Sequence, residues 1–286
     1  MKFAFIQQQL TEFPVRASCR VLAVSPAGYY AWKKRPASVR SERQKELVVQ
    51  IQQVHVANRR VYGSPRIHRA LLAQGQSVCE NTVAKLMKDR QIRAQSKKKF
   101  VPKTTDSTHD QPVARNVLDR QFAAAGLNCK WGVDITYIPT DEGWLYLAGV
   151  LDLCSRKIVG WSMADHMETT LVRDALTMAI VRRHPAPGLL HHSDRGSQYA
   201  SEDYQHLLAT NGMEISMSDK GECWDNACVE SFWGTLKTEL VHHEHYATRE
   251  QARQSIFEYI EVFYNRQRLH SSLGYVSPEA FEASLN

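Results

Sequence analysis

Apolar residues recur at the spacing of short helices through the first third of the chain. From Val15 to about Val24 they lie on one face of a predicted helix. Ser25 and Pro26 then supply the N-cap and the first-turn proline of a second short helix. That helix ends in three basic residues, Lys33, Lys34 and Arg35. A helix, a tight turn and a second helix outline a helix-turn-helix, which we predict for residues 1–50.

A second pair of helices has the same outline in residues 51–95. Ser64 and Pro65 open a helix that Gly75 ends, and a basic helix follows in the segment ENTVAKLMKDR. Two plain helical hairpins that pack on each other have the same periodicity. The pattern alone therefore leaves packing and DNA binding open.

The pattern changes to strands from about Cys129 onward. Three β-rich runs, KWGVDITYIPT, GWLYLAGVLDL and KIVGWSMA, precede a helical stretch, TTLVRDALTMAIVRR. A short strand near 189–192, a helix near 202–210, a strand in MEISMS and two longer helices complete the pattern. Three consecutive strands followed by strand–helix alternation predict an α/β domain over residues 126–286, with a mixed sheet flanked by helices.

Charge divides the chain into two unlike halves. Residues 1–130 hold 24 Lys and Arg against 8 Asp and Glu, whereas residues 131–286 hold 12 against 22. Residues 96–125 have little apolar periodicity and contain Lys97, Lys98 and Lys99, so we interpret them as a basic linker. Since Lys and Arg supply most non-specific affinity for nucleic acid, the split predicts that the basic first half binds DNA. It also indicates that carboxylates have a separate function in the acidic second half.

Three acidic residues stand out by their positions. Asp134 lies in the middle of an apolar β-run, where an unpaired carboxylate is costly. Asp194 follows a short apolar strand, and Glu230 lies in the helical segment DNACVESFWGTLKTEL. Carboxylates from two strands and a helix can converge beside a sheet edge, where they suit Mg²⁺ or Mn²⁺.

Longer motifs around these acids carry a family resemblance. HHSDRGSQY, SMSDKGECWDNACVESFWGTLKTEL and YNRQRLHSSLGYVSPEAF resemble the catalytic region of bacterial DDE insertion-sequence transposases. Specifically, they resemble the OrfB-type proteins of the insertion-sequence-three family, which are relatives of retroviral integrases. The 35 residues between Asp194 and Glu230 match the D-D-35-E spacing of that family. WGVDITYIPT and YGSPRIHRALLAQG extend the resemblance over nearly the whole chain.

The resemblance implies a ribonuclease-H-like integrase catalytic core preceded by an all-α helix-turn-helix region. It implies that Asp134, Asp194 and Glu230 are catalytic and hold Mg²⁺ or Mn²⁺, with two ions in the site. The implied enzyme is a polynucleotidyl transferase that nicks the element ends and transfers the freed 3′-OH to target DNA. The implied partners are the terminal repeats, target DNA, further copies of the chain on DNA, and an upstream-frame protein or fusion.

DNA contacts are predicted from charge and from the helix around Glu230. Lys237 lies two turns after Glu230 on the same helical face, where a phosphate contact and a surface ion pair are both open. Asn226, one turn before Glu230, would orient that carboxylate or cap the helix. We predict DNA contacts at these two residues and at Arg266, Lys33, Lys34, Arg35, Lys97, Lys98 and Lys99.

Two other functions fit the same residues. One is a ribonuclease-H-type nuclease that cuts without joining. The other is a DNA-binding regulator whose acidic domain serves only packing or oligomerisation.

The remaining expectations concern compartment and zinc. The longest apolar run, 144–151, is far shorter than the ~20 residues that span a bilayer, and the N-terminus has no secretory apolar core. We therefore expect a cytoplasmic protein, nucleoid-associated when bound to DNA, whose six cysteines are reduced and mostly buried. His191 and His192 have no further ligands at zinc spacing, so we expect no zinc site.

Overall fold

The computed structural model describes residues 1–36, 38–95, 113–219 and 222–285. The chain forms two compact units, Met1–Gln53 and Val54–Asn286. The predicted DNA contacts at Lys97, Lys98 and Lys99 lie outside the described residues. No helix among the described residues is both long enough and apolar enough to cross a membrane.

The first unit is helical. It contains α1 (Lys2–Gln8), α2 (Val15–Val21), α3 (Pro26–Lys34) and most of α4 (Val39–Ala57). Ile6, Cys19 and Tyr29 form its small core. The Ser25 hydroxyl accepts a hydrogen bond from the Gly28 N–H at 2.9 Å, as expected of an N-cap. The sequence pattern did not resolve α1 and α4, and the boundary drawn at residue 50 falls inside α4.

The second unit begins with the end of α4, and two helices that pack on each other follow, α5 (Ser64–Ala73) and α6 (Glu80–Asp89). Both are amphipathic, and the buried residues are Ile67 and Leu71 on α5 and Val83, Leu86 and Met87 on α6. Gly75 follows α5 with a φ of +80°, a left-handed conformation that glycine adopts without strain. This helix pair was predicted.

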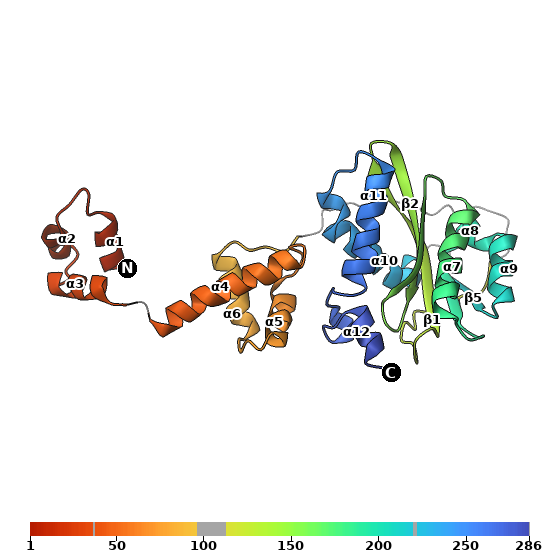
Figure 1. The fold of residues 1–286 in the computed structure, drawn as a ribbon, viewed down its shortest axis with the longest axis horizontal. Coiled ribbons are helices and arrows are strands. Elements are labelled where there is room, and N and C mark those ends of the chain that lie inside the picture. The colour runs from red at the N-terminus through yellow and green to blue at the C-terminus, as the bar shows by residue number, and fades with distance from the viewer. Residues whose placement is uncertain (37, 96–112, 220–221, 286) are drawn as a thin grey trace. The chain divides into compact units, whose positions relative to one another are not determined.

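A five-stranded mixed sheet forms the centre of the second unit (Figure 1). Its strands are β1 (Lys130–Thr140), β2 (Gly143–Asp152), β3 (Ile158–Ala164), β4 (Leu190–Ser193) and β5 (Glu214–Met217), in the spatial order β3-β2-β1-β4-β5. The first three strands are antiparallel, while β4 is parallel to both β1 and β5. The pairing of β4 with β1 covers only residues 130–132 of β1. The pairing therefore stops two residues before Asp134.

Helices cover both faces of the sheet. Figure 1 shows α7, α8 and α9 on one face and α10 and α11 on the other. The bounds are α7 (Thr169–Arg183), α8 (Ser197–Ala200), α9 (Glu202–Thr210), α10 (Ala227–Glu239), α11 (Arg249–Phe257) and α12 (Pro278–Ala283). Short 3₁₀ turns occupy Cys223–Asn226, Val241–His243 and Ser271–Leu273, and a π-helix, η3 (Glu258–Tyr264), continues α11. The predicted α/β class, a mixed sheet flanked by helices behind a helical region, is confirmed.

The helix pair α5–α6 is joined to the rest of this unit through Tyr62 and Glu239. The buried Tyr62 hydroxyl accepts from the Leu269 N–H at 2.8 Å. Glu239, at the end of α10, forms two 2.7 Å hydrogen bonds with the Arg268 guanidinium and a longer ion pair of 3.6 Å with Arg66. Because Glu239 and Arg268 are both buried, loss of one partner would leave an uncompensated charge.

Candidate active site

Asp134 lies at the middle of β1 on the face that α10 covers. Two glycines on this face let α10 approach closely. A Cβ at Gly132 would lie 2.7 Å from a Val229 methyl, and a Cβ at Gly149 would lie 2.7 Å from the Trp233 ring. Gly149 is the cross-strand partner of Asp134. The small residues in the sheet therefore bring α10 down onto Asp134.

Two N–H groups fix the Asp134 carboxylate. Its Oδ1 accepts from the Ile135 backbone N–H at 2.8 Å, and its Oδ2 accepts from the Trp233 indole N–H at 3.1 Å. Trp233 comes one turn after Glu230 on α10, so the same helix carries the predicted third acid and orients the first.

Asp194 comes directly after the end of β4. Because β4 is parallel to β1 and Gly132 pairs with His192, continuation of that register places Asp194 level with Asp134. The Asp194 Oδ1 accepts from the Gly196 N–H at 2.9 Å, which forms a tight turn after the strand. The two aspartates thus come from neighbouring strands.

The N-terminus of α10 is held by Asn226 and Asp225. Asn226 does not cap the helix with its side chain; its amide instead donates to the Val133 carbonyl at 3.0 Å, next to Asp134. Asp225 is buried and accepts hydrogen bonds from Arg120 at 2.8 Å and Asn116 at 2.9 Å. No pattern in the sequence predicted these roles of Asp225, Arg120 and Asn116. Asp225 was visible only as a neighbour of Asn226, and the other two belonged to the predicted linker.

Asp194 and Glu230 act electrostatically on Asp134. Burial, followed by the charge of Asp194 and then that of Glu230, raises the pKa of Asp134 well above its ordinary value. Burial also raises the pKa of Glu230, although its side chain remains exposed in part. Negative charge is therefore concentrated where β1, β4 and α10 meet.

The donor chemistry of this cluster fits a hard divalent cation. Its ligand atoms would all be carboxylate oxygens, which Mg²⁺ and Mn²⁺ prefer, and a cation would relieve the repulsion that raises the pKa of Asp134. The buried Tyr199 hydroxyl has no hydrogen-bond partner in the described structure. Burial, followed by the charges of Asp134 and Asp194, raises its pKa well above the ordinary value. As the side chains stand, however, no three His, Cys, Asp or Glu residues of the described ranges form a ready ion site.

Lys237 lies beside this cluster on the last turn of α10. Its ammonium group is 4.8 Å from the centroid of the Tyr137 ring, a cation–π distance. Burial lowers the pKa of Lys237, and the nearby Asp134 charge opposes that effect. Lys237 and Asn226 are thus the predicted DNA-contact residues that the structure places near the acids.

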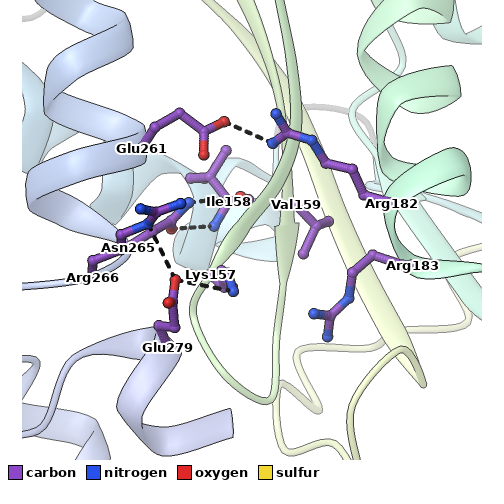
Figure 2. A pocket seen from close by; sticks show the side chains of 9 residues that line it. All are labelled: Lys157, Ile158, Val159, Arg182, Arg183, Glu261, Asn265, Arg266 and Glu279. Atoms are coloured by element: carbon purple, nitrogen blue, oxygen red, sulfur yellow. Dashed lines mark hydrogen bonds and ion pairs between the residues drawn. The ribbon is translucent and has the colours of Figure 1, made fainter. Parts of the chain in front are cut away.

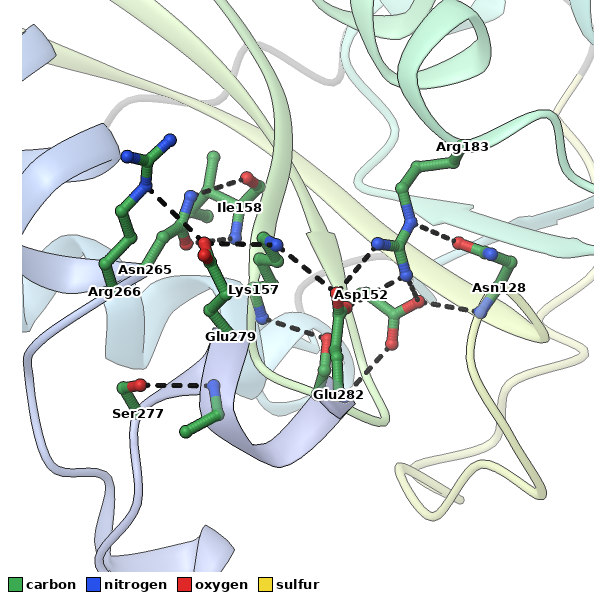
Figure 3. A network of polar contacts seen from close by, with 12 residues as sticks. Asn128, Asp152, Lys157, Ile158, Arg183, Asn265, Arg266, Ser277, Glu279 and Glu282 are labelled. Carbon is green, nitrogen blue, oxygen red and sulfur yellow. Dashed lines mark hydrogen bonds and ion pairs between the residues drawn. The ribbon is translucent and has the colours of Figure 1, made fainter. Parts of the chain in front are cut away.

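Arg266 lies in a different place. It lines a cavity of about 340 Å³ beside β3, on the far side of β2 from β1. Figure 2 shows Arg266 among the other lining residues. Its guanidinium forms a 3.5 Å ion pair with Glu279, and the network in Figure 3 continues from Glu279 to Lys157. Arg183 and Arg182 in the same cavity are paired with Glu282 and Glu261. Each of these basic side chains therefore has a carboxylate partner within the protein.

His191 and His192 are buried in β4 and bonded inside the domain. His191 Nε2 is 2.9 Å from the Tyr204 hydroxyl, and His192 Nδ1 is 2.8 Å from the Ser216 hydroxyl. Burial lowers the pKa of His191 to about 3 and that of His192 to about 4. Both imidazoles are therefore neutral at physiological pH and join β4 to its neighbours.

The expectation that the cysteines are mostly buried is wrong for the described residues. Cys19 is buried, but Cys79 and Cys129 are exposed and two others are partly buried. Cys79 occupies the N-cap position of α6 with its sulfur 3.1 Å from the Thr82 hydroxyl, and a cap position faces solvent.

The domains of this chain match known families. Residues 124–223 and 211–278 match two families described as integrase core domains, and residues 42–100 match an HTH-like domain. Transposase InsF for insertion sequence IS3A, from Escherichia coli strain K12, is 44% identical over 284 residues, covering 99% of this chain and 98% of the relative. The insertion element IS600 uncharacterized 31 kDa protein from Shigella sonnei is 44% identical over 263 residues, covering 92% and 96%.

Solved structures give weaker matches. The simian T-cell lymphotropic virus intasome in complex with PP2A regulatory subunit B56 gamma is 14% identical, covers 81% of this chain and 74% of its own, and has a TM-score of 0.46. The HTLV-2 integrase catalytic core domain in complex with magnesium is 15% identical, covers 56% and 99%, and has a TM-score of 0.43.

The mixed sheet and the matched domains define a protein with an integrase core behind an HTH-like domain. Its near-complete match to InsF identifies the family more closely. The chain belongs to the IS3 family of insertion-sequence transposases.

Proposed function

We propose that this chain is a DNA transposase that cuts the ends of its insertion sequence and transfers the freed 3′-OH to target DNA. Asp134, Asp194 and Glu230 are its catalytic acids. The observation that carries the proposal is the convergence of β1, β4 and α10: Asp194 lies level with Asp134 in the strand register, and the charges of Asp194 and Glu230 raise the pKa of Asp134. The family membership of the chain supports the same activity.

The three acids would hold Mg²⁺ or Mn²⁺, with two ions in the site. Bound divalent ions activate the attacking oxygen and stabilise the leaving oxygen of a phosphodiester. The chain's own groups hold the acids in place. The Trp233 indole N–H orients Asp134, while Asn226 fixes the start of the helix that carries Glu230.

Lys237 contacts a DNA phosphate next to the cut in this proposal. Its ammonium group lies in a partly buried position near Asp134, where desolvation strengthens its attraction to a phosphate. Lys33, Lys34 and Arg35 provide a second, exposed set of phosphate contacts at the end of α3. Together they account for a DNA substrate that meets both the basic first half of the chain and the acidic second half.

The substitution Glu230→Gln tests the catalytic assignment. It keeps the side-chain shape but removes a metal-binding charge, so cleavage of labelled element-end DNA with Mg²⁺ should fall more than about 100-fold, beyond the typical effect of outer-shell metal partners. DNA binding, measured by fluorescence anisotropy, should not change. Glu202→Gln, at an exposed acid in the first turn of α9, is the matched control and should retain cleavage. Full cleavage by Glu230→Gln would refute the role of Glu230.

The same assay separates the three candidate functions. Joined products in a strand-transfer reaction support the transposase. Cut ends without joined products would instead identify a ribonuclease-H-type nuclease. DNA binding without any cutting would identify a DNA-binding regulator.

A further inference from the structure

Two aromatic rings and a lysine form a cluster from three elements: Tyr137 lies on β1, Trp144 on β2 and Lys237 on α10. The rings of Tyr137 and Trp144 meet edge to face, with their centroids 4.8 Å apart and their planes at 77°. The Lys237 ammonium lies over the Tyr137 ring, 4.8 Å from its centroid. Trp144 remains 47% exposed, although its position is fixed against Tyr137.

This cluster follows the proposed catalytic acids along β1 and β2. Tyr137 is three residues after Asp134 on the same strand, and Lys237 comes from the helix that carries Glu230. Burial lowers the pKa of Lys237 and the Asp134 charge opposes that effect, so the ammonium group lies within range of that carboxylate's charge. In the described structure, pairing with β4 stops at Gly132, and this stretch of β1 has β2 as its paired strand. A DNA strand whose phosphate lies at the acids would therefore pass the aromatic cluster.

The chemistry of the cluster suits a nucleobase. A large indole face that is held in one position and exposed to solvent stacks on any base, because every base has a π-face. Positive charge lies close by to attract the phosphates on either side of that base. Lys237 supplies one cation, and Arg249 donates from its Nε to the Trp144 carbonyl at 3.1 Å.

We propose that Trp144, supported by Tyr137, is a stacking platform for an unpaired nucleobase of the DNA strand that is cut. Trp144 pairs with Pro139, five residues beyond Asp134 and about 17 Å along the strand, so the base lies further along the cut strand than the phosphate held at Asp134, Asp194 and Glu230. This inference rests on the proposed function, because that function supplies the DNA strand. It adds a binding site for one base, separate from the phosphate contacts and the carboxylates.

Two substitutions at Trp144 test the platform in the full chain without divalent metal, so that no cleavage occurs. The probe is element-end duplex DNA with a short single-stranded extension that carries 2-aminopurine, compared with the same duplex lacking the extension. Trp144→Ala should weaken binding of the extended DNA roughly 5- to 150-fold, the range for loss of one base–aromatic stack, and leave binding of the blunt duplex unchanged. Trp144→Phe should restore much of the affinity, because a ring remains.

Phe257 offers a matched control. It is 49% exposed and packs edge to face on Trp161, at a centroid distance of 5.9 Å, but it lies on α11. Phe257→Ala should leave both affinities unchanged, and equal thermal midpoints of all variants would show that each one folds. The wild-type chain should quench 2-aminopurine fluorescence on binding, and Trp144→Ala should lose that quenching.

The outcomes separate this inference from the proposed function. Equal affinity of Trp144→Ala and wild type for extended DNA would overturn the platform, as would an equal loss for blunt and extended DNA. If such a result accompanies cleavage that still depends on Glu230, the transposase function stands and only the platform is refuted. Quenching that depends on Trp144, together with full cleavage by Glu230→Gln, would refute the catalytic assignment and keep the base-binding site.

Discussion

Asp134 is held in a position that opposes its own ionisation. Burial disfavours its charged form, and the nearby Asp194 and Glu230 charges add repulsion. The hydrogen bonds from Ile135 and Trp233 offset part of that cost. An ionised Asp134 therefore destabilises the folded, metal-free protein. Such destabilising groups are common at functional sites.

The substitution Asp134→Asn should stabilise the metal-free protein at neutral pH. A carboxyl whose folded-state pKa is raised contributes stability below its ordinary pKa of 3.8, and that contribution is lost as pH rises through the folded-state value. We expect the thermal midpoint of Asp134→Asn to exceed that of wild type by on the order of a few degrees near pH 7. The difference should shrink as pH falls toward the ordinary pKa.

Added Mg²⁺ provides the control for that measurement. Mg²⁺ should raise the midpoint of the wild type, because a ligand that binds only the folded state stabilises it. It should do so much less for Asp134→Asn. A midpoint for Asp134→Asn below that of wild type at neutral pH would contradict the electrostatic account.

At the scale of elements, the site depends on the contact between β1, β2 and α10. Gly132 and Gly149 give Val229 and Trp233 the space to lie directly on the sheet. Asn226 and Asp225 then tie the start of α10 to β1 and to residues 116–120. The position of Glu230 is therefore set by backbone approach as well as by helical periodicity.

Gly149→Ala should disturb this contact. The added methyl would lie 2.7 Å from the Trp233 ring, so α10 must shift, at a cost of about 1–3 kcal/mol in unfolding free energy. Because Trp233 also orients Asp134, cleavage should fall as well. Gly126→Ala is the control, since its methyl would meet only a cysteine sulfur at 3.8 Å. Denaturant unfolding and cleavage assays together check the result. If Gly149→Ala kept the wild-type unfolding free energy and cleavage rate, close packing of α10 on the sheet would not be what positions Asp134 and Glu230.

At the scale of the whole molecule, charge is divided between regions with different tasks. The basic residues at the end of α3 are exposed, whereas the basic residues around Arg266 are paired with glutamates. Net charge therefore does not show which cations are available to DNA. The domain boundaries at 50, 95 and 125 remain a prediction, with residue 50 inside α4 and residues 96–112 outside the described ranges.

Replacement of Lys33, Lys34 and Arg35 by Gln should weaken DNA binding in a salt-dependent way. Each phosphate contact contributes about 0.9 to the slope of log K against log salt concentration, so the slope should become shallower by up to about 2.7. Lys45→Gln is a suitable control, because Lys45 already pairs with Glu42 at 2.8 Å. Anisotropy titrations at several salt concentrations measure the slope, and an unchanged slope would show that these residues do not contact DNA.

The sequence by itself determined most of the helices and strands and the three candidate catalytic acids. The period of apolar positions predicted β1, α7 and α9 at their observed bounds, because these segments bury one side or both against the core. The polar exception in β1 and the spacing of two later acids identified Asp134, Asp194 and Glu230. Such signals are local, so they can be read along the chain.

Only the tertiary structure decided which groups lie together. It placed Lys237 beside Tyr137 but put Arg266 in a separate cavity, where it is paired with Glu279. It also gave Asn226 and Asp225 their partners in β1 and in residues 116–120, more than 90 positions away. Contacts of this kind depend on strand register and on how closely a helix approaches a sheet, and no periodicity in the sequence encodes them.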